Sequence, residues 1–374
     1  MSPSPSFPFQ PIAEYHAHRG EIDAAIQRVL AGGWYILGKE VDAFEREFAA
    51  ELGAAHAVGV GNCTDALVLA LRALDIGEGD EVITVSHTAV ATVMAIELAG
   101  ARPVLVDIDP ASFTMDVNKL ADTVKRNASH RLAAIIPVHL YGQPADMPAI
   151  LEIARANHLR VIEDCAQAHG AKLAGRTVGT FGDLAAYSFY PTKNLAAIGD
   201  GGAVVTHDAA LAQRVRELRQ YGWRERYISS IPGMNSRLDE LQAAILRVKL
   251  RCLGRDNARR RALAQIYSDA LAGSQASPPE VRSGAEHVFH QYVVRSGHRD
   301  ALAEFLKSRG VPTAVHYPQP VHTQPAYRDR VAAGAGGLAE SERACHEVLS
   351  LPMHAYLEEA SVRFAAQQII EWKP

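Results

Sequence analysis

The sequence predicts an α/β protein with a mostly parallel central sheet between layers of helices, followed by a smaller α+β C-terminal domain. Three observations predict this fold: strand and helix patterns alternate from about residue 56 to 205, polar clusters follow the strand ends, and the alternation stops beyond residue 205. Parallel strands joined by helices are buried on both faces and therefore appear as short apolar runs. With 374 residues the chain can form two domains, which we place at residues 1–250 and 251–374.

The first half of the chain contains most of the predicted sheet. After a proline-rich lead, helices are predicted at 21–31 and, from the helical spacing of Val41, Phe44, Phe48 and Leu52, over 41–52. Strands follow at 56–60, 81–85, 103–107, 133–139 and 159–163, separated by helices at 66–74, 88–99, 116–125 and 147–157. A further apolar strand at 184–189 ends at Pro191. Ligands of such sheets bind beyond the carboxyl ends of the strands.

The pattern is less regular after residue 205. A helix is predicted at 211–219, then a long irregular segment at 221–235 and a long helix over 238–271, with the domain boundary within or just after that helix. A strand at 289–295, a helix at 299–309 and a strand at 313–317 begin the smaller domain. Loops as long as 221–235 inside a compact domain are usually functional.

Composition is that of an ordinary soluble globular protein, with 48% hydrophobic and 21% charged residues. The net charge of -4 gives no basic footprint for nucleic acid or an anionic membrane. Apolar runs such as 132–138 are too short to span a bilayer, and residues 1–6 lack the features of a secretion signal. The 4 scattered cysteines and the 16 histidines form no metal motif. We therefore expect a cytoplasmic, reduced protein without a metal site.

Lys193 is the first candidate catalytic residue. It lies in an irregular segment after the buried strand at 184–189, just before the glycine-rich run 199–202. A lysine held in a pocket loses its preference for the charged form and becomes an amine nucleophile. A solvated loop lysine is the alternative for any isolated lysine, but the polar clusters elsewhere in the chain favour a reactive one.

A second cluster joins the strand at 56–60 to the next helix. The linking residues are Gly61, Asn62, Cys63, Thr64 and Asp65. The N–H groups at the start of a helix and the positive end of its dipole bind phosphate well, and Thr64 adds a hydroxyl donor. The alternative is a plain capping turn with Asn62 or Thr64 as the N-cap.

Asp164 closes the apolar strand at 159–163 and completes a set of residues suited to one cofactor. A buried carboxylate needs a partner, which is either a structural arginine or a protonated ring nitrogen. Pyridoxal phosphate would form a Schiff base with Lys193, set its ring nitrogen against Asp164 and its phenolic oxygen against Gln167. Its phosphate would bind Thr64, Ser188 and backbone N–H groups.

Five motifs, taken together, resemble the DegT/DnrJ/StrS family of nucleotide-sugar aminotransferases. They are Asn-Cys-Thr-Asp-Ala-Leu at 62–67, Glu-Asp-Cys-Ala-Gln-Ala-His-Gly at 163–170, Ser-Phe-Tyr-Pro-Thr-Lys-Asn at 188–194, Gly-Asp-Gly-Gly at 199–202, and Gly-Met-Asn-Ser-Arg-Leu-Asp-Glu-Leu-Gln-Ala at 233–243. The resemblance extends from about Tyr35 to Tyr327. It implies an aspartate-aminotransferase-like, fold-type I homodimer with active sites at the subunit interface.

The resemblance also implies roles that spacing alone does not give. Asn62, Cys63 and Thr64 match the family's cofactor-binding turn, and Asn235 is expected to reach the phosphate of the neighbouring subunit's cofactor. Four residues are expected near the sugar nucleotide: Tyr35, Arg237, His316 and His322. For the two histidines, surface or core packing is the alternative.

One position departs from the family pattern. Many relatives place an aromatic residue against the cofactor ring just after the threonine that aligns with Thr88, where this chain has Ala89. The ring would then stack on His87 or pack against aliphatic groups.

The implied reaction is a transamination in two half-reactions, from L-glutamate to a dTDP- or UDP-linked keto-6-deoxyhexose. The amino sugar would serve the synthesis of a polysaccharide, a lipopolysaccharide or a glycosylated metabolite. A dehydratase of the same family is one alternative, but those relatives replace the lysine with histidine. A non-catalytic regulator that binds pyridoxal phosphate is another, and the intact set of site residues argues against it. A nicotinamide-dependent enzyme is a third alternative, but this chain lacks the Gly-x-Gly-x-x-Gly turn after the first strand that such an enzyme would need.

Overall fold

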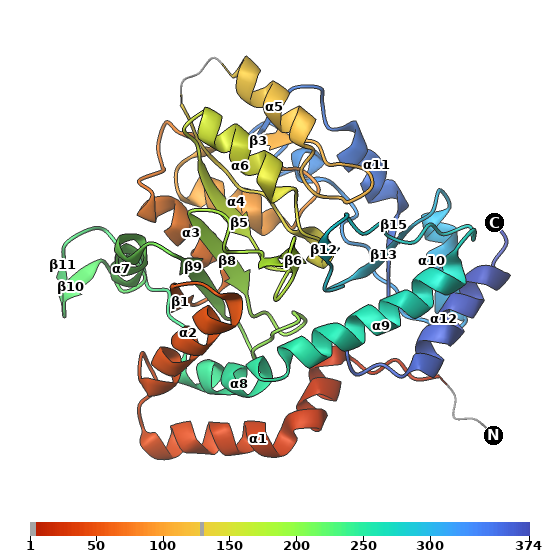
Figure 1. Ribbon diagram of the computed structural model, residues 1–374, viewed down its shortest axis with the longest axis horizontal. Helices are drawn as coiled ribbons and strands as arrows, with labels where there is room; N and C mark the ends of the chain where they lie inside the picture. Colours follow the sequence, from red (N-terminus) through yellow and green to blue (C-terminus); the bar gives the residue numbers. More distant parts are fainter. Residues whose placement is uncertain (1–4, 128–130) are drawn as a thin grey trace.

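An eight-stranded sheet forms the centre of the computed structural model, which describes residues 5–127 and 131–374 (Figure 1). The first four residues of the predicted proline-rich lead lie outside this range. Across the sheet the strands run in the order β1 (His56–Val60), β9 (Gly202–Thr206), β8 (Leu184–Ser188), β5 (Arg160–Asp164), β4 (Leu132–Ile135), β2 (Glu81–Val85), β3 (Arg102–Val106) and β14 (Ala332–Ala333). Only β9 is antiparallel to its neighbours, so the prediction of a mostly parallel sheet is confirmed.

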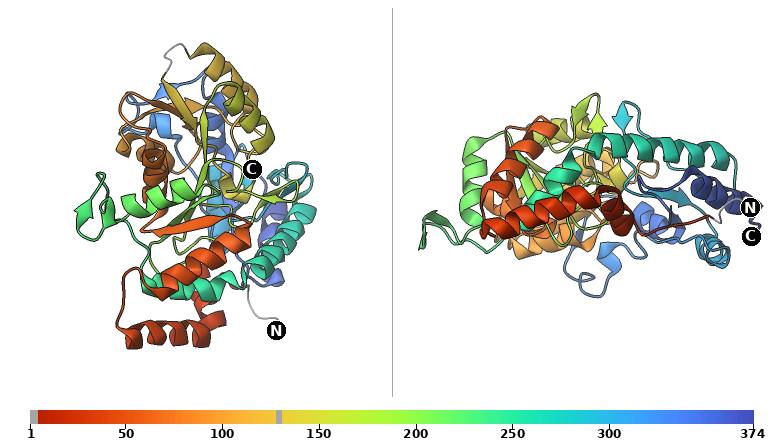
Figure 2. Two further views of the ribbon diagram at one scale, coloured as in Figure 1. Left: turned by 60° about the vertical axis from the view of Figure 1, so that its left-hand side comes forward. Right: turned by 90° about the horizontal axis from the view of Figure 1, so that it is seen from below.

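Helices cover both faces of this sheet (Figure 2). Helices α3 (Cys63–Ala73), α4 (Val90–Leu98) and α7 (Ala209–Leu218) share one apolar core with the sheet, while α2 (Lys39–Leu52), α5 (Val117–Arg126), α6 (Met147–Ala156) and α8 (Glu240–Leu250) pack on the opposite face. Strand β8 shows why two layers are needed. Its Leu184 and Ala186 join the α3 core, whereas Ala185 and Tyr187 join the α2 core, because successive side chains of a strand point to opposite faces.

The remaining elements build the C-terminal part. They are α9 (Leu253–Leu271), α10 (Arg299–Ser308), α11 (Ala339–Glu347) and α12 (Glu359–Glu371), with β13 (Tyr292–Arg295) paired to β15 (Val348–Leu351). The three-stranded sheet of β12 (Ala285–Glu286), β6 (Lys172–Leu173) and β7 (Arg176–Thr177) and the 3-10 turns η1 (Leu140–Gly142) and η2 (Val321–Thr323) complete the fold. This part has its own apolar core, although β14 and Val321 join the large sheet. The division at residue 250 stays a prediction.

Several predicted elements differ from those observed. The predicted helix at 21–31 is the end of α1 (Gln10–Gly32), whose backbone leaves helical geometry at His18. The helix predicted over 238–271 ends at Leu250 and restarts as α9. The segment 221–235 contains a hairpin of β10 (Trp223–Glu225) and β11 (Ile228–Ser229), which projects from the body in Figure 1. The predicted strand at 313–317 is reduced to a single bridge between Ala314 and Ser350.

Tertiary contacts explain the extra length of α1. Glu14 forms a buried ion pair with Lys249 of α8, with 3.0 Å between Oε2 and Nζ. The partner lies 235 residues away, so no local pattern could reveal it. None of the helices within 5–127 and 131–374 is long and apolar enough to cross a membrane.

The polar clusters singled out in the sequence follow strands that all run in the same direction. Strands β2, β4, β5 and β8 are parallel, and β1 shares their direction because β9 is antiparallel to both β1 and β8. Their carboxyl ends therefore meet at one edge of the sheet, where parallel sheets bind ligands. Asp164, Ser188 and the helix start at Asn62 all lie there.

Candidate active site

Hydrogen bonds of the Lys193 backbone and of the next side chain fix Lys193 in the loop after β8. The Lys193 N–H donates to the carbonyl of Tyr190 at 2.9 Å. The next residue, Asn194, is buried, and its amide donates to Asn257 at 2.9 Å and to the Val288 carbonyl at 3.0 Å. Burial lowers the pKa of Lys193. A lowered pKa is suited to a nucleophilic amine, and the catalytic role of Lys193 stays a prediction.

Asp164 lies close enough to Lys193 for each charge to affect the other's pKa. It is the last residue of β5 and is 5% exposed. Burial raises its pKa, while the hydroxyl of Thr92, the N–H of Ala166 and the charge of Lys193 act in the opposite direction. The two hydrogen bonds, at 2.8 and 3.1 Å, fix one carboxylate oxygen each.

Thr92 was not among the predicted site residues. It comes from α4, the helix that follows β2, and its hydroxyl also lies 3.2 Å from that of Thr88. Thr88 precedes the N-cap of α4, but in the helix predicted over 88–99 the two threonines are four residues apart and would share one face. That spacing was the available signal.

Replacing Thr92 by valine is expected to destabilise the protein and to raise the pKa of Asp164 further. A buried hydrogen bond to a charged group contributes about 1.5–3 kcal/mol. Since the bond favours the ionised carboxylate, the loss should be larger above the pH at which Asp164 ionises than below it. Urea unfolding of the cofactor-free protein across pH measures this. Thr92→Ser keeps the hydroxyl and serves as the control; equal losses in both variants would contradict the assignment.

The turn between β1 and α3 presents free hydrogen-bond donors. Asn62 is the N-cap of α3, and its side chain accepts from the Asp65 N–H at 2.8 Å. Within the described residues no hydrogen bond uses the hydroxyl of Thr64 or the N–H groups of Cys63 and Thr64. Gly202 permits the close approach of β9, because a side-chain carbon there would lie 2.5 Å from the Asn62 backbone. The arrangement is suited to an anion.

Gln167 is anchored from two sides. Its Oε1 accepts from the Tyr141 N–H at 2.7 Å, and its Nε2 donates to the Tyr317 hydroxyl at 3.0 Å. Burial raises the pKa of Tyr317 to about 12, and the nearby Asp164 acts in the same direction. Tyr317, which the predicted set omitted, therefore belongs to this site. Ser188 is 7% exposed and accepts from the Tyr190 N–H at 3.3 Å.

His87 is enclosed by other side chains. Its Nε2 lies 2.7 Å from the Tyr141 hydroxyl and its Nδ1 3.3 Å from the Cys345 sulfur. Since the Tyr141 hydroxyl donates to the His316 carbonyl, Nε2 carries the proton and Nδ1 accepts. Burial lowers the pKa of His87 to about 4, so the ring is neutral. Its predicted stacking role stays a prediction, and Ala89 lies half-buried at the N-cap of α4.

The two predicted substrate histidines have different surroundings. His316 is half-buried, its Nδ1 lies 2.8 Å from the Ser350 hydroxyl, and burial together with the charge of Lys193 lowers its pKa. It is therefore brought to the site. His322 is held between the Ser86 hydroxyl at 2.7 Å and Glu342 at 3.0 Å. These contacts fit the packing alternative, and its substrate role stays a prediction.

Tyr35, Arg237 and Asn235 lie toward solvent. Tyr35 is 49% exposed, and its carbonyl accepts from the Glu240 N–H at 3.2 Å. Arg237 is half-buried, with its guanidinium 5.8 Å from the centre of the Tyr221 ring. Asn235 is exposed, while the adjacent Ser236 ties this segment to Gly61 and Asp65 at 2.9 and 2.6 Å.

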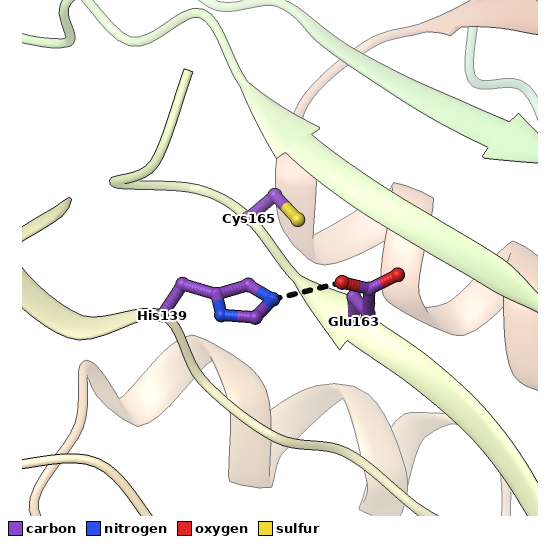
Figure 3. A group of neighbouring side chains, drawn as sticks. All are labelled: His139, Glu163 and Cys165. Carbon is purple, nitrogen blue, oxygen red and sulfur yellow. Dashed lines mark hydrogen bonds and ion pairs between the residues drawn. The ribbon is translucent and has the colours of Figure 1, made fainter. Parts of the chain in front are cut away.

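A buried group of His139, Glu163 and Cys165 has the composition of a metal site (Figure 3). The Glu163 carboxylate, however, accepts from three backbone N–H groups, those of residues 179, 181 and 182, at 2.7–2.8 Å. His139 Nδ1 accepts from the Ala145 N–H at 3.0 Å, so Nε2 carries the proton and donates to Glu163 at 3.0 Å. These bonds make the group a structural anchor beneath the strand end.

Removing the Glu163 side chain is expected to cost about 3–5 kcal/mol of stability, because buried donors lose their acceptor. Glu163→Ala should therefore lower the denaturant midpoint strongly. Glu163→Gln keeps one acceptor oxygen and should cost less. Equal stability of Glu163→Ala and the wild type would refute the anchoring role.

The residues at this edge fit pyridoxal phosphate. An amine with a lowered pKa, a buried carboxylate and unused donors at a helix start match the three polar parts of that cofactor: its aldehyde, ring nitrogen and phosphate. Among the described residues, no arginine pairs with the carboxylate of Asp164. The structural-arginine alternative is thus not observed.

Known proteins resemble this chain in both sequence and structure. The sequence model of the DegT/DnrJ/EryC1/StrS aminotransferase family matches residues 16–369. The dTDP-3-amino-3,4,6-trideoxy-α-D-glucose transaminase of Streptomyces venezuelae is 46% identical over 371 residues, covering 99% of this chain and 97% of that protein. The UDP-N-acetyl-3-dehydro-α-D-glucosamine 3-aminotransferase of Acidithiobacillus ferrooxidans is 43% identical over 356 residues, covering 94% and 95%. The crystal structure of S. venezuelae DesV in complex with a ketimine intermediate superposes with a TM-score of 0.94, at 46% identity and 99% coverage of both chains.

Proposed function

The chain belongs to the DegT/DnrJ/EryC1/StrS aminotransferase family, and we propose that it transfers the amino group of L-glutamate to a nucleotide-linked keto sugar. It is a pyridoxal-phosphate-dependent aminotransferase. One observation carries the residue assignment: Lys193, with its pKa lowered by burial, lies within electrostatic reach of the buried Asp164 at the strand ends.

Each residue of the site has a proposed task. Pyridoxal phosphate, when bound, supplies an electron sink for the breaking of the substrate's Cα–H bond. Lys193 would hold the cofactor's aldehyde carbon until the amino group of the donor displaces it, and its freed amine would then accept and return the proton, for which a lowered pKa is suited. Asp164 would keep the ring nitrogen charged, while Gln167 would orient the ring. The Thr64 hydroxyl, the α3 N–H groups and Ser188 would bind the phosphate.

The proposed acceptor is a dTDP- or UDP-linked keto-6-deoxyhexose. The similarity to transaminases named for dTDP- and UDP-linked sugars supports this substrate class. His316 lies near Lys193, and Tyr35 and Arg237 offer a ring face and a cation at more exposed positions. A cation and an aromatic face suit a diphosphate and a base. The amino sugar would enter the synthesis of a polysaccharide or a glycosylated metabolite.

A spectrum of the purified protein with pyridoxal phosphate, before and after L-glutamate, tests the first half of this function. We expect a visible band that glutamate bleaches. Mass spectrometry after adding dTDP- and UDP-linked keto sugars in turn should then detect one aminated product. A protein that binds the cofactor without responding to any amino donor would contradict the proposal.

We further propose a cytoplasmic homodimer with shared active sites. The exposed Asn235 and the aromatic residues of the projecting hairpin, with Tyr227 72% exposed, support a subunit contact there. All four cysteines are free, which suits a reducing compartment.

Mixing two inactive variants tests the shared site. In a hybrid of Lys193→Ala and Asn235→Ala subunits, one site would carry both changes and the other neither. Activity should therefore return when the two proteins are exchanged into hybrids. A monomeric mass in solution, or hybrids without activity, would refute this arrangement.

A further inference from the structure

The first residue of α1, Gln10, contacts the backbone of the loop that carries Lys193. The Nε2 of Gln10 donates to the Lys193 carbonyl at 3.1 Å, although the two residues are 183 positions apart. Its Oε1 accepts from Nη2 of Arg260, also at 3.1 Å. The orientation of this amide is determined by its partners, because a guanidinium has only donors and a carbonyl only accepts.

Arg260 is in turn a fixed point of the fold. It lies on α9 and is 2% exposed, and its Nη1 lies within hydrogen-bond distance of the carbonyls of residues 289, 290 and 353, at 3.0, 3.4 and 3.2 Å. These carbonyls belong to the C-terminal part of the chain. Gln10 therefore links that part to the loop of Lys193 through a single side chain.

The segment before Gln10 is held in place as well. The carbonyl of Pro8 lies 2.9 Å from Nε2 of His354, and the backbone of Ser6 exchanges two hydrogen bonds with the Ser361 hydroxyl. Figure 1 shows this end of the chain lying beside α12. The backbone just before Gln10 is therefore held by hydrogen bonds, although the Gln10 side chain is only half-buried.

We propose that Gln10 is a positioning residue for Lys193, fixing the backbone from which the reactive side chain extends. The inference rests on the proposed role of Lys193. With the Lys193 N–H bound to Tyr190 and its carbonyl bound to Gln10, both backbone polar groups of the lysine are fixed. A reaction slows considerably when a reacting group is displaced even slightly from its productive position.

Two substitutions separate this role from simple support of Arg260. Gln10→Leu removes both hydrogen bonds. Gln10→Glu keeps an acceptor for Arg260 but has no donor for the Lys193 carbonyl. The positioning role requires both variants to disturb Lys193, whereas a purely structural role requires only the leucine variant to be affected. Gln367→Leu, which removes one exposed hydrogen bond on α12, is the matched control.

The decisive measurement uses the cofactor-free protein. Brief labelling with acetic anhydride across pH, followed by mass spectrometry of the peptide containing Lys193, gives the pH at which its amine titrates. Because burial lowers this pKa, loosening the loop should move the midpoint upward in both Gln10 variants. The other ionisable groups near the amine are Cys63, Asp164, His169, His290 and His316, and neither substitution changes them. Gln10→Glu adds a carboxylate that also raises the midpoint, so the midpoint of Gln10→Leu is the one that reports loosening of the loop.

Two further readouts complete the test. With pyridoxal phosphate and L-glutamate, both variants should bleach about 2- to 10-fold more slowly in a single turnover, and the thermal midpoint of Gln10→Glu should stay closer to the wild type than that of Gln10→Leu. An unchanged labelling midpoint in Gln10→Leu would overturn the proposal, as would wild-type labelling and bleaching in Gln10→Glu. The labelling result holds even if the wild type lacks transaminase activity, so failure of the proposed function is distinguishable.

Discussion

Replacing Lys193 by alanine will abolish the visible absorption band given by pyridoxal phosphate and reduce transamination by about a hundred- to ten-thousand-fold or more. The change removes both the amine that would hold the cofactor and the group that would move the proton. Lys193→Arg should be equally inactive, since its guanidinium keeps the charge but does not act as a base near neutral pH. Stopped-flow absorbance with L-glutamate measures the loss.

The same substitution should change how stability depends on pH. Burial lowers the folded-state pKa of Lys193 below its ordinary value of 10.5. At pH values between the lowered pKa and 10.5, the unfolded chain therefore binds more protons than the folded protein. The free energy of unfolding of the cofactor-free protein therefore rises with pH across that window. Lys193→Ala should remove this rise and be more stable than the wild type below the window.

Lys172→Ala is the control for both measurements. Lys172 is partly exposed and lies 4.0 Å from Glu286, a surface pair of small energetic value. It should leave the absorption band, the rate and the pH dependence unchanged. Full activity in Lys193→Ala would remove the basis of the assigned mechanism.

Replacing Asp164 by asparagine is expected to slow transamination by about a hundred- to a thousand-fold, the usual cost of removing one preorganised electrostatic contact. The protein should still fold, because Thr92 can donate to the amide oxygen. The N–H of Ala166, however, would then face the amide nitrogen, which cannot accept. Steady-state kinetics with saturating cofactor separates this loss from weaker cofactor binding.

The sign of the stability change also follows. Burial raises the folded-state pKa of Asp164 above 3.8, so the folded protein binds more protons than the unfolded chain between 3.8 and the raised value. Stability contributed by the protonated form is lost as the pH rises through that window. Asp164→Asn should therefore be more stable than the wild type above it, in the cofactor-free protein.

Asp122→Asn on α5 provides the comparison, because its carboxylate is exposed and lies 4.0 Å from Arg126. Neither its activity nor its pH dependence should differ from the wild type. A rate within a few-fold of the wild type in Asp164→Asn would contradict the role of the carboxylate.

Local sequence determined the core and the central pair of residues. The apolar runs of β1 and β2 gave their bounds correctly, since a strand buried on both faces depends on its own few residues. Strand ends of parallel strands must share an edge, so Lys193 and Asp164 could be expected together before their contacts were known.

Tertiary structure alone decided what surrounds them. The helix α1 is stabilised by the Glu14–Lys249 pair, the carboxylate of Asp164 is oriented by Thr92 from 72 residues away, and the Lys193 carbonyl is bound by Gln10 from 183 residues away. None of these partners is a neighbour in sequence, and each satisfies a buried polar group that secondary structure leaves unpaired. Periodicity and turn signals report only local preferences, whereas the pairing of buried polar groups depends on how the whole chain packs.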